Sequence, residues 1–170
     1  MVFVVTTAVP LSVWIENWFL LAIAVFSGYL VVAGYRVVKR RRARLTEARR
    51  ADYATHGTML TAGGVMVAVG GWGAAAGTHE LAPVLVVFGF IGVALATREL
   101  RQIRLSRTGR TPWFERHIGL MGGAYIATVT AAVTVNLTFL PPLVRWLGPT
   151  VVGVPLIFYG VRKYRGVFGR

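Results

Sequence analysis

Two histidines are the side chains in this sequence with the most distinctive chemistry. His56 and His117 each lie at the start of a long run of neutral residues, on the side where basic residues gather. Two histidines at one depth on facing helices can ligate the iron of a b-type haem, whose propionates could pair with Arg98 or Arg116. The alternative is that both are interfacial side chains, half-solvated among arginines. The chain has three histidines, so it could hold one such haem at most.

A second set of polar side chains is expected at one level, at the opposite ends of the neutral runs. The set comprises Glu16, His79, Glu80, Asn136 and Arg145. An ion pair of Arg145 with Glu16 or Glu80 is expected, because a lone charge at membrane depth is costly. The set could bind an external ligand or admit protons, or it could clamp the helix ends together. His79, Glu80 and Glu16 lack a diagnostic metal-ligand spacing, so no metal is predicted.

Hydroxyl side chains recur along the run that follows His117. Thr128, Thr130 and Thr134 precede Asn136, and this polar stripe could line a substrate path or form hydrogen bonds between helices. No acidic residue lies midway along a neutral run, which disfavours a proton relay or a cation pump. The absence of cysteine excludes disulfides, thiolate metal sites and cysteine nucleophiles. No catalytic residue is assigned, and a protein without enzymatic activity is expected.

Long apolar helices must position these residues. Hydrophobic residues make up 55% of the chain and charged residues only 15%, against about 25% charged in soluble domains. A helix needs about 17–25 apolar residues to cross a bilayer. Five spans are predicted, over residues 17–38, 57–77, 81–97, 118–138 and 143–161. The sequence therefore predicts an all-α polytopic membrane helical bundle, a single transmembrane domain over 1–170, in which 1–15 is interfacial or extends the first span.

Small residues are expected to let these helices pack closely. The span at 57–77 is rich in glycine, and Gly119, Gly123, Ala127 and Ala131 recur every four residues in the fourth span. Small residues allow transmembrane backbones to approach each other closely. Pro149 and Pro155 each remove a backbone hydrogen bond from the fifth span, which is therefore expected to be kinked.

The distribution of charge predicts the topology. The net charge is +13, and 18 of the 19 basic residues lie in three clusters, at 36–50, 98–116 and 162–170. Five spans place all three clusters on one side, which the positive-inside rule assigns to the cytoplasm. The chain is then a multi-pass protein of the cell membrane with its N-terminus outside and its C-terminus inside. The basic face is expected to attract anionic lipid headgroups. A membrane protein partner or a homo-oligomer is the alternative, and nucleic acid is not expected.

Part of the chain resembles a known group of sequences. The segment Arg116–Thr128, with the sequence RHIGLMGGAYIAT, resembles a stretch in a family of prokaryotic multispan membrane proteins that has no assigned function. Trp146–Thr150 and Gly153–Ile157 extend this resemblance over 113–160. The resemblance implies a shared motif that includes His117, Tyr125, Trp146 and Pro149, but it implies no activity.

Three functions remain open from the sequence. The first is a non-catalytic subunit or accessory factor that binds a partner or lipid, because the short loops leave little room for a catalytic domain. The second is a small transporter or channel-like protein, in which the polar stripe and the kinked last helix line a path. The third is a haem-binding redox protein that uses His56 and His117.

Overall fold

Five long helices form the structure of this chain. The computed structural model describes Pro10, Trp14 and residues 18–42, 50–78, 80–104 and 113–168. The helices are α2 (Trp18–Arg42), α3 (Arg50–Ala76), α4 (Ala82–Arg104), α5 (Trp113–Asn136) and α6 (Pro142–Phe168). All five are long and apolar enough to cross a membrane. The predicted all-α, multi-pass membrane bundle is thereby confirmed.

The helices extend beyond the apolar runs that predicted them, mainly on the side of the basic clusters. α3 begins at Arg50 rather than at residue 57, and α4 continues to Arg104 rather than ending at residue 97. Arginine, glutamate and alanine are good helix formers, so the helical backbone continues after the apolar residues end. The consequence is that Asp52 and Glu99 lie on helices, where the sequence placed them in loops.

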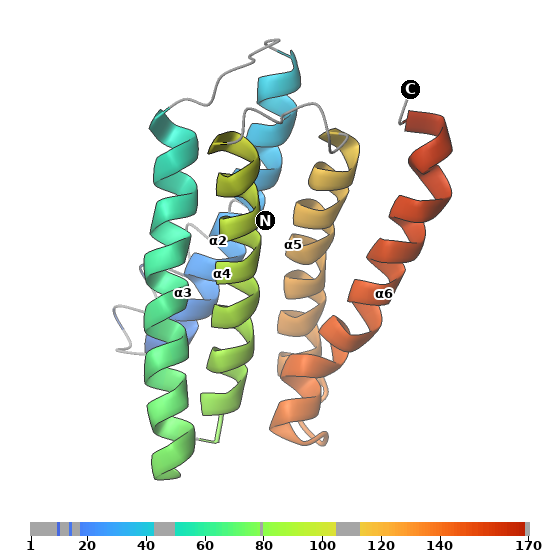
Figure 1. Cartoon of the computed structure of the whole chain (residues 1–170). Helices are drawn as coiled ribbons and strands as arrows, with labels where there is room; N and C mark the ends of the chain where they lie inside the picture. The colour runs from blue at the N-terminus through green and yellow to red at the C-terminus, as the bar shows by residue number, and fades with distance from the viewer. Residues whose placement is uncertain are drawn as a thin grey trace.

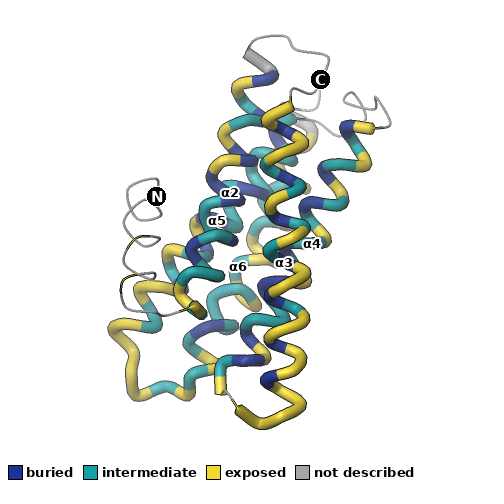
Figure 2. Tube along the Cα trace, turned by 90° about the vertical axis from the view of Figure 1, so that its left-hand side faces the viewer, coloured by how far each residue is buried: buried dark blue, intermediate teal, exposed yellow. Residues whose placement is uncertain are grey.

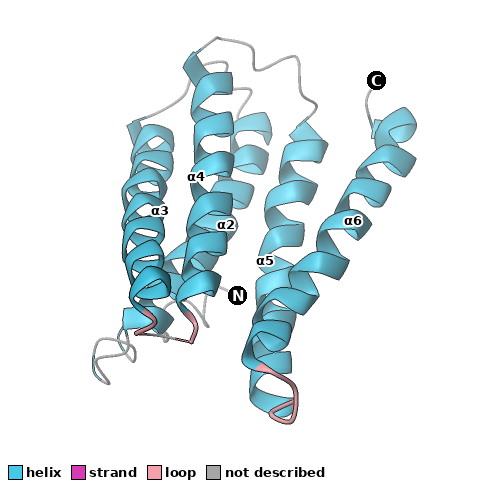
Figure 3. Cartoon of the chain, turned by 60° about the horizontal axis from the view of Figure 1, so that its bottom comes forward, coloured by secondary structure: helices cyan, strands magenta, loops and turns pink. Residues whose placement is uncertain are grey.

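Alternating helix direction brings the basic residues of the described helices, with the exception of Arg145, to one end of the bundle (Figure 1). We call this end, where α2, α4 and α6 finish and α3 and α5 begin, the basic end. The opposite end, which holds the turns between α3 and α4 and between α5 and α6, we call the far end. α3 packs with α4 and α5 packs with α6, while α2 contacts both hairpins (Figure 3). α6 leans away from α5 toward the basic end (Figure 1).

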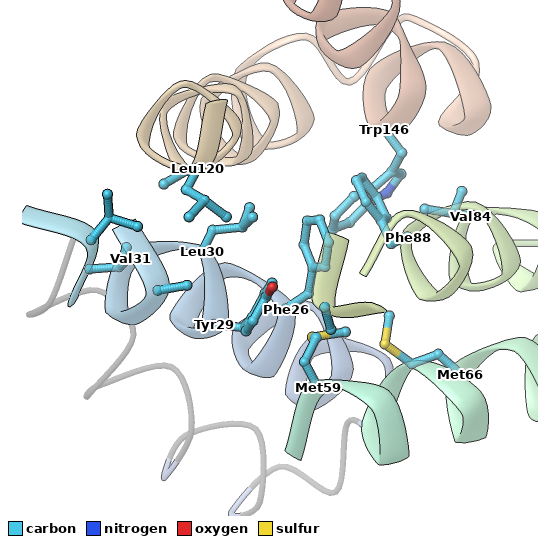
Figure 4. Close-up of a cluster of buried hydrophobic side chains, with 14 residues drawn as sticks. Phe26, Tyr29, Leu30, Val31, Met59, Met66, Val84, Phe88, Leu120 and Trp146 are labelled. Carbon is cyan, nitrogen blue, oxygen red and sulfur yellow. The ribbon is translucent and has the colours of Figure 1, made fainter. Parts of the chain in front are cut away.

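The core lies where the helices meet α2. Phe26 and Leu30 of α2 are buried among residues of the other four helices (Figure 4). The Phe26 ring lies 5.2 Å from that of Phe88, between centroids, and the Phe19 ring meets Trp146 edge-on at 4.9 Å. The buried residues follow the facing sides of the helices, and exposed residues cover the outside (Figure 2). Most of the exposed large side chains are apolar, as lipid contact requires.

Glycines set the distance between neighbouring helices. A Cβ atom added at Gly63 of α3 would lie 2.9 Å from the carbonyl oxygen of Gly89 in α4, so these two backbones touch. This contact confirms the close packing predicted for the second span. In the α5–α6 pair, Ile157 fills the space beside Gly122. Gly119 of the predicted stripe faces open space, because four-residue periodicity marks a helix face without saying which neighbour covers it.

The Gly63–Gly89 contact predicts that two adjacent glycine-to-alanine substitutions differ in their effect on the free energy of unfolding. Gly63→Ala should lower the free energy of unfolding by about 1–3 kcal/mol, because the new methyl group meets a backbone carbonyl that cannot move aside. Gly64→Ala is the matched control, since nothing lies within 4 Å of its added Cβ. Denaturant unfolding in detergent, followed by circular dichroism, measures both. Equal stability of the two variants would contradict the close approach.

Candidate functional site

A network of buried polar side chains lies at the basic end, and we call it the basic-end network. It draws on four helices and comprises Tyr29 and Arg36 of α2, Asp52 and His56 of α3, Glu99 of α4 and Arg116 of α5. Tyr29, Asp52, His56 and Glu99 are all buried. Buried ionisable groups in a membrane bundle are costly unless they are paired. The network therefore has to satisfy its charges internally.

Two ion pairs supply this neutralisation. Arg36 Nε lies 2.7 Å from Asp52 Oδ1 and joins α2 to α3. Arg116 Nε lies 3.0 Å from Glu99 Oε2, and the second guanidinium nitrogen bonds the same carboxylate, which joins α5 to α4. The side chains of the second pair are only 8% and 5% exposed. A pair so shielded from solvent interacts far more strongly than a surface pair.

His56 lies inside this network. Its Nδ1 is 3.3 Å from the hydroxyl oxygen of Tyr29, and the two rings meet edge-on at 5.8 Å between centroids. The charges of Glu99 and Asp52 act on the imidazole, and those of their partners Arg116 and Arg36 act on it in the opposite sense. Asp52 precedes His56 by one helical turn, so both side chains project from the same face of α3. The structure thus makes His56 a buried group, in place of the half-solvated one that the alternative from the sequence expected.

His117 contacts a different side of α2. Its Nδ1 lies 3.1 Å from the carbonyl oxygen of Gly34, and its ring lies beside Trp113. Tyr29 and Gly34 are five residues apart, which corresponds to about 140° around an α-helix. The two histidines therefore approach α2 from different sides, and the structure does not bring their rings onto one face. The haem hypothesis stays a prediction that gains no geometric support.

At the far end, Arg145 contacts α5. Its Nη1 donates a hydrogen bond to the carbonyl oxygen of Thr134, at 3.1 Å. Thr134 is among the last residues of α5, whose carbonyls have no partner within their own helix. Glu80 is exposed and forms no ion pair with Arg145, so the expected pairing of Arg145 stays a prediction for Glu16 alone. Asn136 donates to the Ala132 carbonyl of its own helix, at 2.8 Å.

Two members of the predicted far-end set, Glu16 and His79, lie outside the described residues. The grouping of the whole set, and of the three residues weighed for a metal site, therefore stays a prediction. Among the described residues, no group of three His, Cys, Asp or Glu side chains could hold a metal ion. Of the described members of the far-end set, Arg145 is the one with a hydrogen bond to another helix.

The predicted polar stripe divides between two faces of α5. Thr128 is exposed, and its hydroxyl donates to the Ala124 carbonyl of its own helix, at 3.2 Å. Thr130 is buried, and its hydroxyl has no hydrogen-bond partner. The Thr134 hydroxyl is also buried without a partner. Thr130 and Thr134 are one turn apart and share a face, so they act together and Thr128 does not.

Exposed cations surround the basic end, and we call them the cationic rim. They are Lys39, Arg50, Arg98, Arg101, Arg104, Arg162 and Lys163. The three described acids at this end are all in ion pairs, because Glu115 also pairs with Arg165 of α6, at 2.8 Å. The rim therefore presents positive charge that no described carboxylate neutralises.

Sequence reasoning missed Tyr29, Asp52 and Glu99. The spacing of Asp52 and His56 was an available signal, because residues four apart lie on one helix face. Glu99 was hidden by its place among arginines, which suggested a loop. Tyr29 carried no signal, since one tyrosine in an apolar run is common in membrane helices.

The Glu99–Arg116 pair should be necessary for stability. Glu99→Gln should lower the free energy of unfolding by about 3–5 kcal/mol, because it leaves the buried Arg116 without a counterion. Arg165→Gln is the control, because Arg165 is 63% exposed and such pairs contribute at most about 1 kcal/mol. The double variant Glu99→Gln/Arg116→Gln should recover much of the loss. Denaturant unfolding in detergent measures all three, and equal losses for Glu99→Gln and Arg165→Gln would contradict the pairing.

Comparison with known proteins adds no family to this geometry. No family model matches the chain, and no curated protein or solved structure is significantly similar to it. The resemblance of residues 113–160 to a family of prokaryotic membrane proteins therefore stays a prediction. A function has to be argued from the basic end and the far end themselves.

Proposed function

We propose that the chain is a non-catalytic integral membrane protein that binds anionic lipid headgroups with its cationic rim. The observation that carries this proposal is the separation of charge at the basic end. Asp52, Glu99 and Glu115 are each in an ion pair with an arginine. The rim cations pair with none of the described carboxylates, and they are exposed.

The placement of the rim favours a lipid leaflet as the partner. Rim residues come from α2, α3, α4 and α6, so they are spread around the bundle. Arg98, Arg101 and Arg104 share one side of α4, within about 120° of arc. Each basic residue near an anionic membrane surface contributes about 1 kcal/mol of attraction. A ring of cations at the ends of membrane-spanning helices matches a surface of headgroups better than it matches one compact ligand.

The same charge distribution supports an orientation. The positive-inside rule would place the basic end in the cytoplasm, the N-terminus outside and the C-terminus inside, in the cell membrane. An acidic segment of a partner membrane protein, or a second copy of the chain, is the alternative partner. Transport along the polar stripe and haem binding at His56 and His117 also stay as alternatives, and neither the rim nor the ion pairs favour them.

Lipid selectivity tests the proposal. Native mass spectrometry of the protein from mixed micelles should show preferential retention of phosphatidylglycerol over phosphatidylcholine. The triple variant Arg98→Gln/Arg101→Gln/Arg104→Gln should lose at least about tenfold of this preference, because three surface charges are removed. High salt should also weaken the preference, since exposed charges are screened.

The control is the triple lysine variant at the same positions, which keeps the charge and should keep the preference. Equal retention of both lipids by the unmodified protein would contradict the proposal. So would one acidic protein that co-purifies at fixed stoichiometry and leaves no lipid preference, because the rim would then belong to a protein interface.

The orientation is tested with single cysteines, because the chain contains none. Phe139→Cys lies in the far-end turn, where Phe139 is 78% exposed, and Lys163→Cys lies at the basic end. A membrane-impermeant maleimide should label Phe139→Cys in intact cells and Lys163→Cys only after lysis. The reverse pattern would contradict the predicted orientation while leaving the fold unchanged.

A further inference from the structure

Four buried side-chain atoms of the described residues lack a hydrogen-bond partner, and all four belong to α5 or α6. They are the hydroxyl oxygens of Thr130, Thr134 and Thr150 and the Nε of Arg145. Buried polar atoms in proteins are nearly always bonded, and exceptions call for an explanation such as a bound ion or water. Their concentration in one helix pair marks this place as different from the basic-end network, where the charges are paired.

The four atoms lie in one seam between the two helices. Ile157 packs at Gly122, Ile126 packs at Gly153, and Arg145 bonds the Thr134 carbonyl. These contacts fix the antiparallel register of α5 and α6, and in this register Thr130 lies at the level of Pro149 and Thr150. We call this region, between Thr130, Thr134, Arg145 and Thr150, the far-end seam.

The threonines of the seam differ from other helical threonines of this chain. The hydroxyls of Thr55, Thr61 and Thr128 each donate to the carbonyl four residues earlier. Those of Thr130, Thr134 and Thr150 do not, although the same backbone carbonyls precede them. Thr130 is only 2% exposed. Three hydroxyls are thus held inside the bundle without being used by their own helices.

The chemistry of the seam selects an anion. Arg145 carries a full positive charge, is the one basic residue outside the three clusters, and pairs with no described carboxylate. Its Nε–H and the threonine hydroxyls can all donate hydrogen bonds. An oxyanion accepts such bonds and neutralises the guanidinium at the same time. We infer that the far-end seam binds a small oxyanion of the phosphate type, either free or as the headgroup of a phospholipid.

The backbone of α6 gives the seam a way to open. Pro149 lies inside α6 and has no N–H to donate to the carbonyl of Arg145, one turn earlier. The first two turns of α6, which carry Arg145, are therefore held to the rest of the helix by one bond fewer. Because Trp146 in these turns is packed in the core, the missing bond permits a small local adjustment at Pro149, which admits a ligand from the far end, where α5 finishes at Asn136.

The test measures the thermal unfolding midpoint in a maltoside detergent, which contains no phosphate. The rim variant Arg98→Gln/Arg101→Gln/Arg104→Gln serves as the background, so that phosphate at the rim does not contribute. Inorganic phosphate should raise the midpoint by about 5 °C relative to chloride at the same ionic strength, as a ligand of the native state does. Phosphatidic acid in the same micelles forms the second arm.

The variants locate the effect. Arg145→Gln should abolish the shift, and Thr130→Val, which keeps the side-chain shape, should reduce it at least threefold. Thr128→Val is the matched control and should leave it unchanged, because that hydroxyl is bonded to its own helix. If Arg145→Gln fails to fold, the comparison of Thr130→Val with Thr128→Val still shows whether phosphate binds at the far-end seam.

Each outcome has a defined meaning. A shift with inorganic phosphate supports a site for the free anion, and a shift with phosphatidic acid alone supports a lipid headgroup site. The absence of a shift in both arms overturns the proposal, as does an equal shift in Thr130→Val and the background protein. The proposal is also overturned if phosphate raises the unfolding midpoint only in the Glu16→Gln variant, because Glu16 would then be the partner of Arg145.

Discussion

The pairing of Glu99 with Arg116 is the interaction on which the arrangement at the basic end depends. The described residues of α4 and α5 do not pack directly against each other, and α2 lies against both helices. The buried Glu99–Arg116 pair joins α4 to α5 across the bundle. Its low exposure makes the attraction strong and makes the loss of either partner costly. Arg36 and Asp52 join α2 to α3 through a second ion pair. Ion pairs therefore connect the helices at the basic end, whereas glycine contacts bring the helices of each hairpin close together.

The two ends of the bundle differ in whether their buried polar groups have bonding partners. At the basic end, the described acids are in ion pairs, and the remaining described cations are exposed except for the buried Arg40. At the far end, one arginine and three threonine hydroxyls are enclosed without full satisfaction. In a bilayer, water cannot complete such bonds at low cost. The paired basic-end network therefore suits a structural role. The exposed cationic rim and the far-end seam, with its unsatisfied polar atoms, suit binding roles.

The packing of α6 changes along its length. Near the far end, Trp146 is buried against the core and Gly153 receives Ile126. Toward the basic end, the helix leans outward (Figure 1). Phe158 and Tyr159 of this part are exposed. Pro155 lies between these two parts, and Pro149 lies within the packed part. The far-end seam thus lies along the anchored part of α6, where the hydrogen bond missing at Pro149 permits a small local adjustment without loss of the core.

The sequence by itself determined the five spans, the all-helical class and the clustering of basic residues at one end of the bundle. Run length and charge position are local properties, so no knowledge of packing is needed to read them. The tertiary structure alone decided that Glu99 meets Arg116, that Tyr29 meets His56, and that Thr130 faces α6 while Thr128 does not. These pairings depend on how far each helix is rotated about its own axis. Contacts such as Gly63 with Gly89 and Gly122 with Ile157 set that rotation, because they join residues far apart in the chain.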